Sequence, residues 1–209
     1  MSSRTTIELG TVESLWRYPV KSMGGESLEE ASILNGGILG DRAYALIDDS
    51  NGKVASAKHP AKWARLLKMG ANYLRPPDST SPPPPVQITL ANGAEINSNE
   101  DKIDALLSEQ LGRAVTLTRI RPESVSLERV DPLLKEESIQ DTGALMMEGR
   151  FTDYAAIHLV TTATLSRLAE LAPESNFDVK RFRPNLLIDT GDESNGFLEN
   201  NWVGIESFG

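Results

Sequence analysis

Short apolar or alternating runs, separated by turn residues, dominate the first 120 residues and are typical of β-strands. An apolar, aromatic run over 43–47 is followed by Asn51-Gly52, and an alternating run over 86–90 is followed by Asn92-Gly93. Because Asn-Gly favours the left-handed turn that joins two adjacent strands, both places predict β-hairpins. Three further stretches carry a strand pattern: 7–16, 54–57 and 115–118.

Helical spacing occurs in two places. Residues 99–111 place four apolar side chains on one face, with acids in the first turn and Gly112 positioned to end the helix. A second helical face runs from Leu165 to Ala172 and ends at Pro173, after an apolar strand over 157–160. Another strand is expected over 185–189. Residues 63–69 fit either a short helix or a buried strand.

Two stretches predict irregular structure. Residues 75–85 include four consecutive prolines, which remove backbone donors and fix φ, so an extended surface loop is expected there rather than a proline-recognition ligand. Residues 121–150 are rich in acids and serine and hold few apolar positions, as in a linker or a long loop.

These patterns predict a mostly β protein with a few helices, of the α+β class. We expect a β-barrel-like domain over 1–120, the linker or long loop over 121–150, and a second, incomplete β domain over 151–209. The residues from Trp202 to Gly209 resemble the start of another strand, so the fold is expected to continue beyond the last residue.

Composition narrows the class of function. The 209 residues carry a formal net charge of −9, which argues against nonspecific binding to nucleic acid or to anionic membranes. There is no cysteine, hence no thiolate ligand or cysteine nucleophile, and the two histidines are too far apart in sequence for a zinc motif. No run has signal-peptide or membrane-spanning length, so a cytoplasmic location is expected.

Four places along the chain suit an anionic ligand. Lysine and arginine supply charge, hydroxyls supply neutral donors, and a strand end that opens a helix offers free backbone N–H groups. Arginine forks also bind phosphate in a bidentate manner, and asparagine can donate and accept toward a heterocycle. The four places are Lys21-Ser22, Arg42, Thr161-Thr162 and Arg183-Pro184-Asn185.

Each place also has a plain structural alternative. Lys21 could lie on a solvated turn, Arg42 could pair with Asp41 or Asp48, Thr161 could only cap its helix, and Arg183 could pair with Asp178 or Asp189. Among the remaining polar residues, His158 is expected to be a core histidine and His59 a turn residue. The acids over 123–153 have no metal-binding spacing.

An ordered set of motifs resembles a known family. Tyr18-Pro19-Val20-Lys21-Ser22, Gly40-Asp41-Arg42 and Ala57-Lys58-His59-Pro60 look like the N-terminal β-barrel domain of MOSC proteins. Phe151-Thr152-Asp153, residues 159–165, Arg181-Phe182-Arg183-Pro184-Asn185 and residues 199–204 look like the first part of the MOSC domain. This family includes amidoxime-reducing components and the C-terminal domain of molybdenum cofactor sulfurase.

The resemblance implies a molybdenum–pterin cofactor and a set of residues that bind it. Matched motif by motif, the cofactor-binding residues would be Lys21, Ser22, Arg42, Lys58, Thr161, Thr162, Arg183 and Asn185. The cysteine that ligates metal or carries sulfur in the family lies downstream of the Trp-x-Gly segment and is absent from these residues. No metal ligand is therefore predicted within the chain, and the reacting residue is unknown.

The resemblance further implies a molybdenum-dependent oxidoreductase that reduces N-hydroxylated or related small molecules, with an electron-transfer partner, in the complete protein. Two other functions remain open: a sulfur carrier or sulfurtransferase in metal-cofactor assembly, and a non-catalytic module that binds an anion or a partner. Pyridoxal phosphate could use the same anion site, with Lys21 as the lysine for a Schiff base.

Overall fold

The structure is a computed structural model that describes residues 8–34, 37–122, 126–131, 133, 135–141, 150–152, 155–191 and 196–202. The chain divides into two compact units. Unit 1 combines Met1–Trp16 with Ile157–Gly209, and unit 2 consists of Arg17–Ala156. The domain boundaries proposed from the sequence, which run along the chain, stay a prediction.

Unit 2 consists mainly of strands. They are β2 (Glu26–Leu28), β3 (Ile33–Leu34), β4 (Gly37–Ile38), β5 (Ala45–Asp48), β6 (Lys53–Val54), β7 (Gly70–Tyr73), β8 (Val86–Thr89), β9 (Glu95–Asn97), β10 (Val115–Thr118), β11 (Ser126–Val130) and β12 (Glu137–Asp141). Apart from β2, they form sheets in the orders β10-β5-β6-β11-β12, β7-β8-β9 and β3-β4. The mostly β, α+β class is confirmed, although none of these sheets closes into a barrel among the described residues.

Both predicted hairpins are present. Strand β5 pairs antiparallel with β6, with Ile47 opposite Val54, and Gly52 in the turn has φ 71°. Strand β8 pairs antiparallel with β9, and Gly93 in that turn has φ 85°. Because a positive φ is strained for residues with a side chain, the glycine of each Asn-Gly pair determines where the strand reverses.

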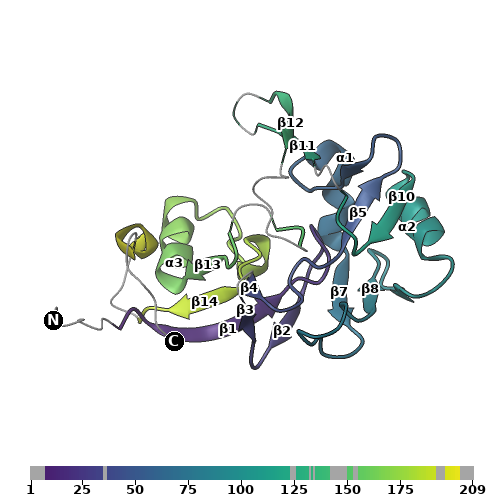
Figure 1. Ribbon diagram of the computed structural model, residues 1–209. Helices are drawn as coiled ribbons and strands as arrows, with labels where there is room; N and C mark the ends of the chain where they lie inside the picture. Colours follow the sequence, from purple (N-terminus) through teal and green to yellow (C-terminus); the bar gives the residue numbers. More distant parts are fainter. Residues whose placement is uncertain are drawn as a thin grey trace. The chain divides into compact units, whose positions relative to one another are not determined.

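Two helical segments of unit 2 pack against its larger core. Residues 63–69 adopt the helical alternative, as the end of α1 (Pro60–Trp63) and the 3-10 turn η1 (Ala64–Lys68). Helix α2 (Ile103–Leu111) begins later than expected and ends at Gly112, whose φ is 66°. It lies beside β10 (Figure 1) and buries Ile103, Leu107 and Leu111 in that core.

Of the two stretches predicted to be irregular, 75–85 and 121–150, the first has no regular element and the second contains strands. No regular element covers the proline-rich residues 75–85, and the Tyr44 hydroxyl donates to the carbonyl oxygen of Pro84 at 3.1 Å. In contrast, the described part of 121–150 contains the β11–β12 hairpin. Leu127 of β11 is fully buried against Ala45 and Phe151, so one apolar residue anchors a strand in an otherwise polar stretch.

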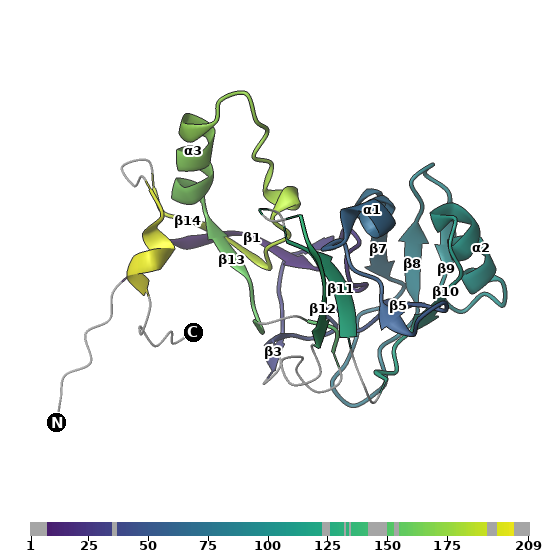
Figure 2. The same ribbon diagram turned by 90° about the horizontal axis from the view of Figure 1, so that it is seen from above.

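Unit 1 contains a sheet with β14 at its centre. Its elements are β1 (Thr11–Arg17, whose last residue belongs to unit 2), β13 (Leu159–Thr161), α3 (Thr162–Leu171), η2 (Val179–Arg181), β14 (Leu186–Asp189) and η3 (Leu198–Trp202). Strand β14 pairs antiparallel with β1 and parallel with β13, and β2 is the edge strand of this sheet, in the order β13-β14-β1-β2. Helix α3 supplies the crossover between β13 and β14 and lies against both strands (Figures 1 and 2).

Candidate functional site

The stretch Tyr18–Ser22 lies beside residues 42–44 of unit 2. The N–H of Arg42 donates to the carbonyl oxygen of Tyr18 at 2.7 Å, and the N–H of Lys21 donates to the carbonyl oxygen of Tyr44 at 2.9 Å. Backbone pairing therefore brings together Lys21, Ser22 and Arg42, which the sequence had placed about 20 residues apart. We refer to Lys21, Ser22, Arg42 and the nearby Lys58 as the Lys21 corner.

Lys21 is buried rather than placed on a solvated turn. Its side chain has only 5% of its surface exposed, and its Nζ donates to the carbonyl oxygen of Phe151 at 2.8 Å. An ammonium group removed from water is costly unless polar groups surround it. The Phe151 carbonyl thus holds the amino group of Lys21 in the interior of unit 2.

Ser22 has an unusual backbone conformation. Its φ is 67°, it is 3% exposed, and its Oγ accepts a hydrogen bond from the N–H of Ala57 at 3.1 Å. A hydroxyl that accepts one bond still carries a proton that it can donate. Within the part of the chain that the structure describes, this hydroxyl makes no other hydrogen bond.

Arg42 also has a left-handed backbone, with φ 47°. Its Nη1 pairs with Oδ2 of the fully buried Asp41, and its Cζ lies 4.6 Å from the centroid of the Tyr18 ring. Oδ1 of Asp41 accepts the N–H of Tyr18 at 2.8 Å. The Asp41 pairing that the sequence left open is therefore present, and it holds the guanidinium in place within unit 2.

Lys58 adjoins the corner through the chain. It follows Ala57, which bonds to Ser22, and its carbonyl oxygen accepts the N–H of Val130 at 2.9 Å. Lys58 is half-buried. The hairpin strand β11 therefore fixes the backbone that carries this lysine.

Gly25 serves the chain itself rather than leaving room for a ligand. A Cβ at Gly25 would lie 2.1 Å from the carbonyl oxygen of Arg17. The neighbouring Gly24 exchanges backbone bonds with Met69 and Ala71. The close approach at these glycines is thus between two segments of unit 2.

In unit 1, Thr161 ends β13 and caps α3. It is fully buried, and its Oγ1 accepts the N–H of Thr164 at 3.0 Å, which confirms the capping alternative. Thr162 is the first residue of α3, and its hydroxyl accepts the N–H of Thr190, which follows β14, at 3.2 Å. Both hydroxyls therefore stabilise the β13–α3 junction.

A carboxylate of the chain already lies at the N-terminus of α3. Glu199 accepts the N–H of Thr161 through Oε1 at 2.8 Å and the hydroxyl of Thr164 through Oε2 at 2.6 Å. Burial raises the pKa of Glu199, but the hydrogen bonds from Thr164 and Thr161 outweigh it, so the pKa lies below its ordinary value. The helix end that predicted an anion site thus holds an internal anion, which sequence reasoning did not identify.

Arg183 and Asn185 both lie just before β14. Arg183 has φ 52°. Asn185 is 1% exposed; its Oδ1 accepts the N–H of His158 at 3.1 Å and its Nδ2 donates to the carbonyl oxygen of Trp16 at 3.2 Å. Asn185 therefore braces the segments on either side of β14.

The two histidines exchange the environments that the sequence suggested. His158 is exposed rather than in the core, because the expected strand begins only at Leu159. His59 is 2% exposed, and its Nε2 lies 3.0 Å from Oε1 of Glu137 on β12. Its Nδ1 has no hydrogen-bond partner in the described structure. The sequence around His59 carries no apolar pattern that would have predicted this burial.

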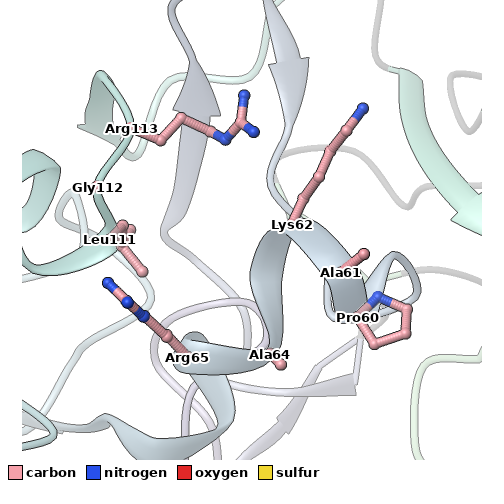
Figure 3. A pocket seen from close by; sticks show the side chains of 8 residues that line it. All are labelled: Pro60, Ala61, Lys62, Ala64, Arg65, Leu111, Gly112 and Arg113. Atoms are coloured by element: carbon pink, nitrogen blue, oxygen red, sulfur yellow. The ribbon is translucent and has the colours of Figure 1, made fainter.

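A surface pocket of about 340 Å³ in unit 2 is lined by Lys62, Arg65 and Arg113 (Figure 3). These side chains come from three segments and do not converge on one point in that view. Each has a structural partner: Lys62 bonds to Glu128, whose pKa it lowers, Arg65 donates to the Gln110 carbonyl, and Arg113 lies over the Trp63 ring. The pocket is therefore accounted for by packing.

The described residues lack two kinds of feature. No group of three or more histidine, cysteine, aspartate or glutamate side chains there is arranged to hold a metal ion. No helix among the same residues has the length and apolar character to cross a membrane.

Sequence comparisons match two stretches of the chain, one near each end, to known domains. Residues 9–74 match the MOSC N-terminal beta barrel domain, and residues 147–209 match the MOSC domain. The chain is also 24% identical, over 228 aligned positions, to the molybdenum cofactor sulfurase of Oryza sativa subsp. japonica. That alignment covers 96% of this chain but 26% of the relative, so the chain spans about a quarter of the relative's length.

Proposed function

Because the chain belongs to the MOSC family, we propose that it binds a molybdenum–pterin cofactor and acts in a molybdenum-dependent oxidoreductase that reduces small N-hydroxylated molecules. Lys21, Ser22, Arg42 and Lys58 of unit 2 contribute to cofactor binding. Unit 1 contributes Thr161, Thr162, Arg183 and Asn185. The cofactor supplies the redox chemistry, and the residues of this chain bind and orient it.

Backbone strain is the observation that carries this proposal. Among the described residues, four non-glycine residues have positive φ, and three of them are predicted cofactor ligands: Ser22, Arg42 and Arg183. Each costs roughly 1–3 kcal/mol relative to an ordinary conformation, and such residues concentrate at ligand sites. Their coincidence with residues chosen for chemistry supports a binding role.

The donor set also fits a phosphate-bearing pterin. The Lys21 corner combines a buried ammonium, a half-buried guanidinium and the Ser22 hydroxyl, which retains a proton to donate. Charged donors suit phosphate oxygens, and a neutral hydroxyl adds a hydrogen bond without further charge. The net charge of −9 makes such a basic interior feature distinctive.

The test compares two neighbouring arginines. Arg183→Ala should weaken binding of purified molybdopterin cofactor by about 10- to 150-fold, because one charged hydrogen-bonded contact contributes about 1.5–3 kcal/mol. Arg181→Ala, at an exposed position two residues earlier, is the matched control and should bind like the parent. Calorimetric titration and molybdenum content provide the measurements. Parental cofactor content in the Arg183→Ala protein would count decisively against the proposal.

A second function, sulfur transfer in cofactor assembly, is supported by the name of the relative, molybdenum cofactor sulfurase. A persulfide requires a cysteine, and these 209 residues contain none. The sulfur carrier would therefore belong to another part of the protein or to a partner. Mass spectrometry of the full gene product separates the functions: a persulfide adduct favours sulfur transfer, and stoichiometric pterin favours the oxidoreductase.

A further inference from the structure

Hydrogen bonds fasten residues 150 and 151 to unit 2, and those of Phe151 reach the Lys21 corner. Arg150 donates through Nη1 to the carbonyl oxygen of Ile38 at 2.9 Å. The N–H of Phe151 donates to the carbonyl oxygen of Arg42 at 2.9 Å, and the carbonyl oxygen of Phe151 accepts Nζ of Lys21 at 2.8 Å. With its ring fully buried, Phe151 connects two cationic residues of the corner, Lys21 and Arg42.

The next residue, Thr152, holds a buried hydroxyl without a partner. Thr152 is 5% exposed, and its Oγ1 makes no hydrogen bond in the described part of the chain. Leaving a hydroxyl unsatisfied in this way costs about 1–3 kcal/mol, and valine has the same shape without that cost. Packing alone therefore does not explain a threonine here.

From this geometry we propose that Thr152 is a further ligand-binding residue. Its hydroxyl donates a hydrogen bond to an oxygen of the oxyanion that the Lys21 corner binds. Consecutive Cα atoms are about 3.8 Å apart, so Thr152 lies one residue from the carbonyl that holds Lys21 and from the N–H that meets Arg42. The inference rests on the proposed cofactor-binding function and adds a residue to it.

The substitution Thr152→Val removes Oγ1 and keeps the shape of the side chain, while Thr152→Ser keeps the hydroxyl. The ligands for titration are inorganic phosphate and purified molybdopterin cofactor, and the melting temperature of the ligand-free protein is measured in parallel. We expect Thr152→Val to bind the cofactor about 3- to 10-fold more weakly, as for one lost hydrogen bond. Its ligand-free melting temperature should equal or exceed that of the parent. Thr152→Ser should bind within about 2-fold of the parent.

The two ligands identify which oxygen is contacted. A loss with both phosphate and cofactor assigns the Thr152 contact to the phosphate group, and a loss with the cofactor alone assigns it to the rest of that molecule. Parental binding by Thr152→Val would overturn the inference and leave the proposed function intact. A Thr152→Val protein that melts lower or fails to fold would also overturn it, because the hydroxyl would then be structural. Failure of the parent to bind either ligand would overturn both.

Discussion

The Lys21 corner of unit 2 and the β13–α3–β14 region of unit 1 were both expected to bind an anion, yet they use their polar groups differently. In the corner, Lys21 and Arg42 bring positive charge inside unit 2, and the hydroxyls of Ser22 and Thr152 retain hydrogen-bonding capacity. In unit 1, the hydroxyl of Thr161 caps α3 and the amide of Asn185 braces neighbouring strands. The polar groups of the corner thus keep bonding capacity, whereas the Thr161 hydroxyl and the Asn185 amide already bond to the chain.

Glu199 accounts for much of this difference. Free N–H groups at a helix N-terminus attract negative charge, and in unit 1 a carboxylate of the chain meets that demand. In unit 2 the corresponding internal carboxylate is Asp41, which pairs with Arg42. A sequence pattern that suits an anion therefore predicts that a negative group lies there. It does not predict whether that group belongs to a ligand or to the chain itself.

The largest effect is expected from the carboxylate that holds the corner together. Asp41→Asn removes the charge opposite Arg42 in a fully buried position, and breaking such a buried pair destabilises a protein by roughly 3–5 kcal/mol. Chemical denaturation measures the loss, and Asp101→Asn at an exposed position is the control. An unchanged free energy of unfolding would mean that Asp41 does not organise the corner.

A smaller effect is expected from the brace in unit 1. Asn185→Ala leaves the His158 N–H and the Trp16 carbonyl without this partner, at roughly 1–3 kcal/mol for each group that stays buried. The exposed Asn200→Ala provides the comparison. Measuring both the free energy of unfolding and cofactor binding for each variant distinguishes the two regions. If Asn185→Ala loses binding while its unfolding free energy stays unchanged, Asn185 does not brace unit 1, and the contrast between the regions is wrong.

The sequence predicted the elements that local chemistry determines. Asn-Gly pairs located both hairpins, and Gly112 located the end of α2, because each depends on a backbone conformation that few residues adopt. The α+β class followed from these signals. The β11–β12 hairpin was missed, since its burial depends on Leu127 packing against residues more than 20 positions away, which no local pattern records.

The same distinction applies to the candidate site. Residue types alone identified Lys21, Ser22 and Arg42, and backbone pairing then brought them together. The roles of Thr152, His59 and Glu199 were not predicted, because they depend on burial and on long-range contacts. Thr152 has a buried hydroxyl without a partner in the described structure, the His59 ring lies against Glu137, and the Glu199 carboxylate lies at the N-terminus of α3. The left-handed backbone of Ser22 and Arg183 likewise carries no sequence signal, because neither is glycine.

The smallest effect is expected from Glu199, and it depends on pH. The pKa of this carboxyl lies below its ordinary value of 4.5, so its charged form stabilises unit 1. That stabilisation is complete above about pH 4.5 and is lost as the pH falls through the lowered pKa. Glu199→Gln should therefore melt below the parent at neutral pH, and the difference should shrink in acid, whereas the exposed Glu174→Gln should show no such dependence.

If the internal carboxylate does replace a ligand, added phosphate should raise the melting temperature of Glu199→Gln more than that of the parent, because the α3 N-terminus then lacks its own anion. Equal responses would remove the explanation offered for the difference between the two regions.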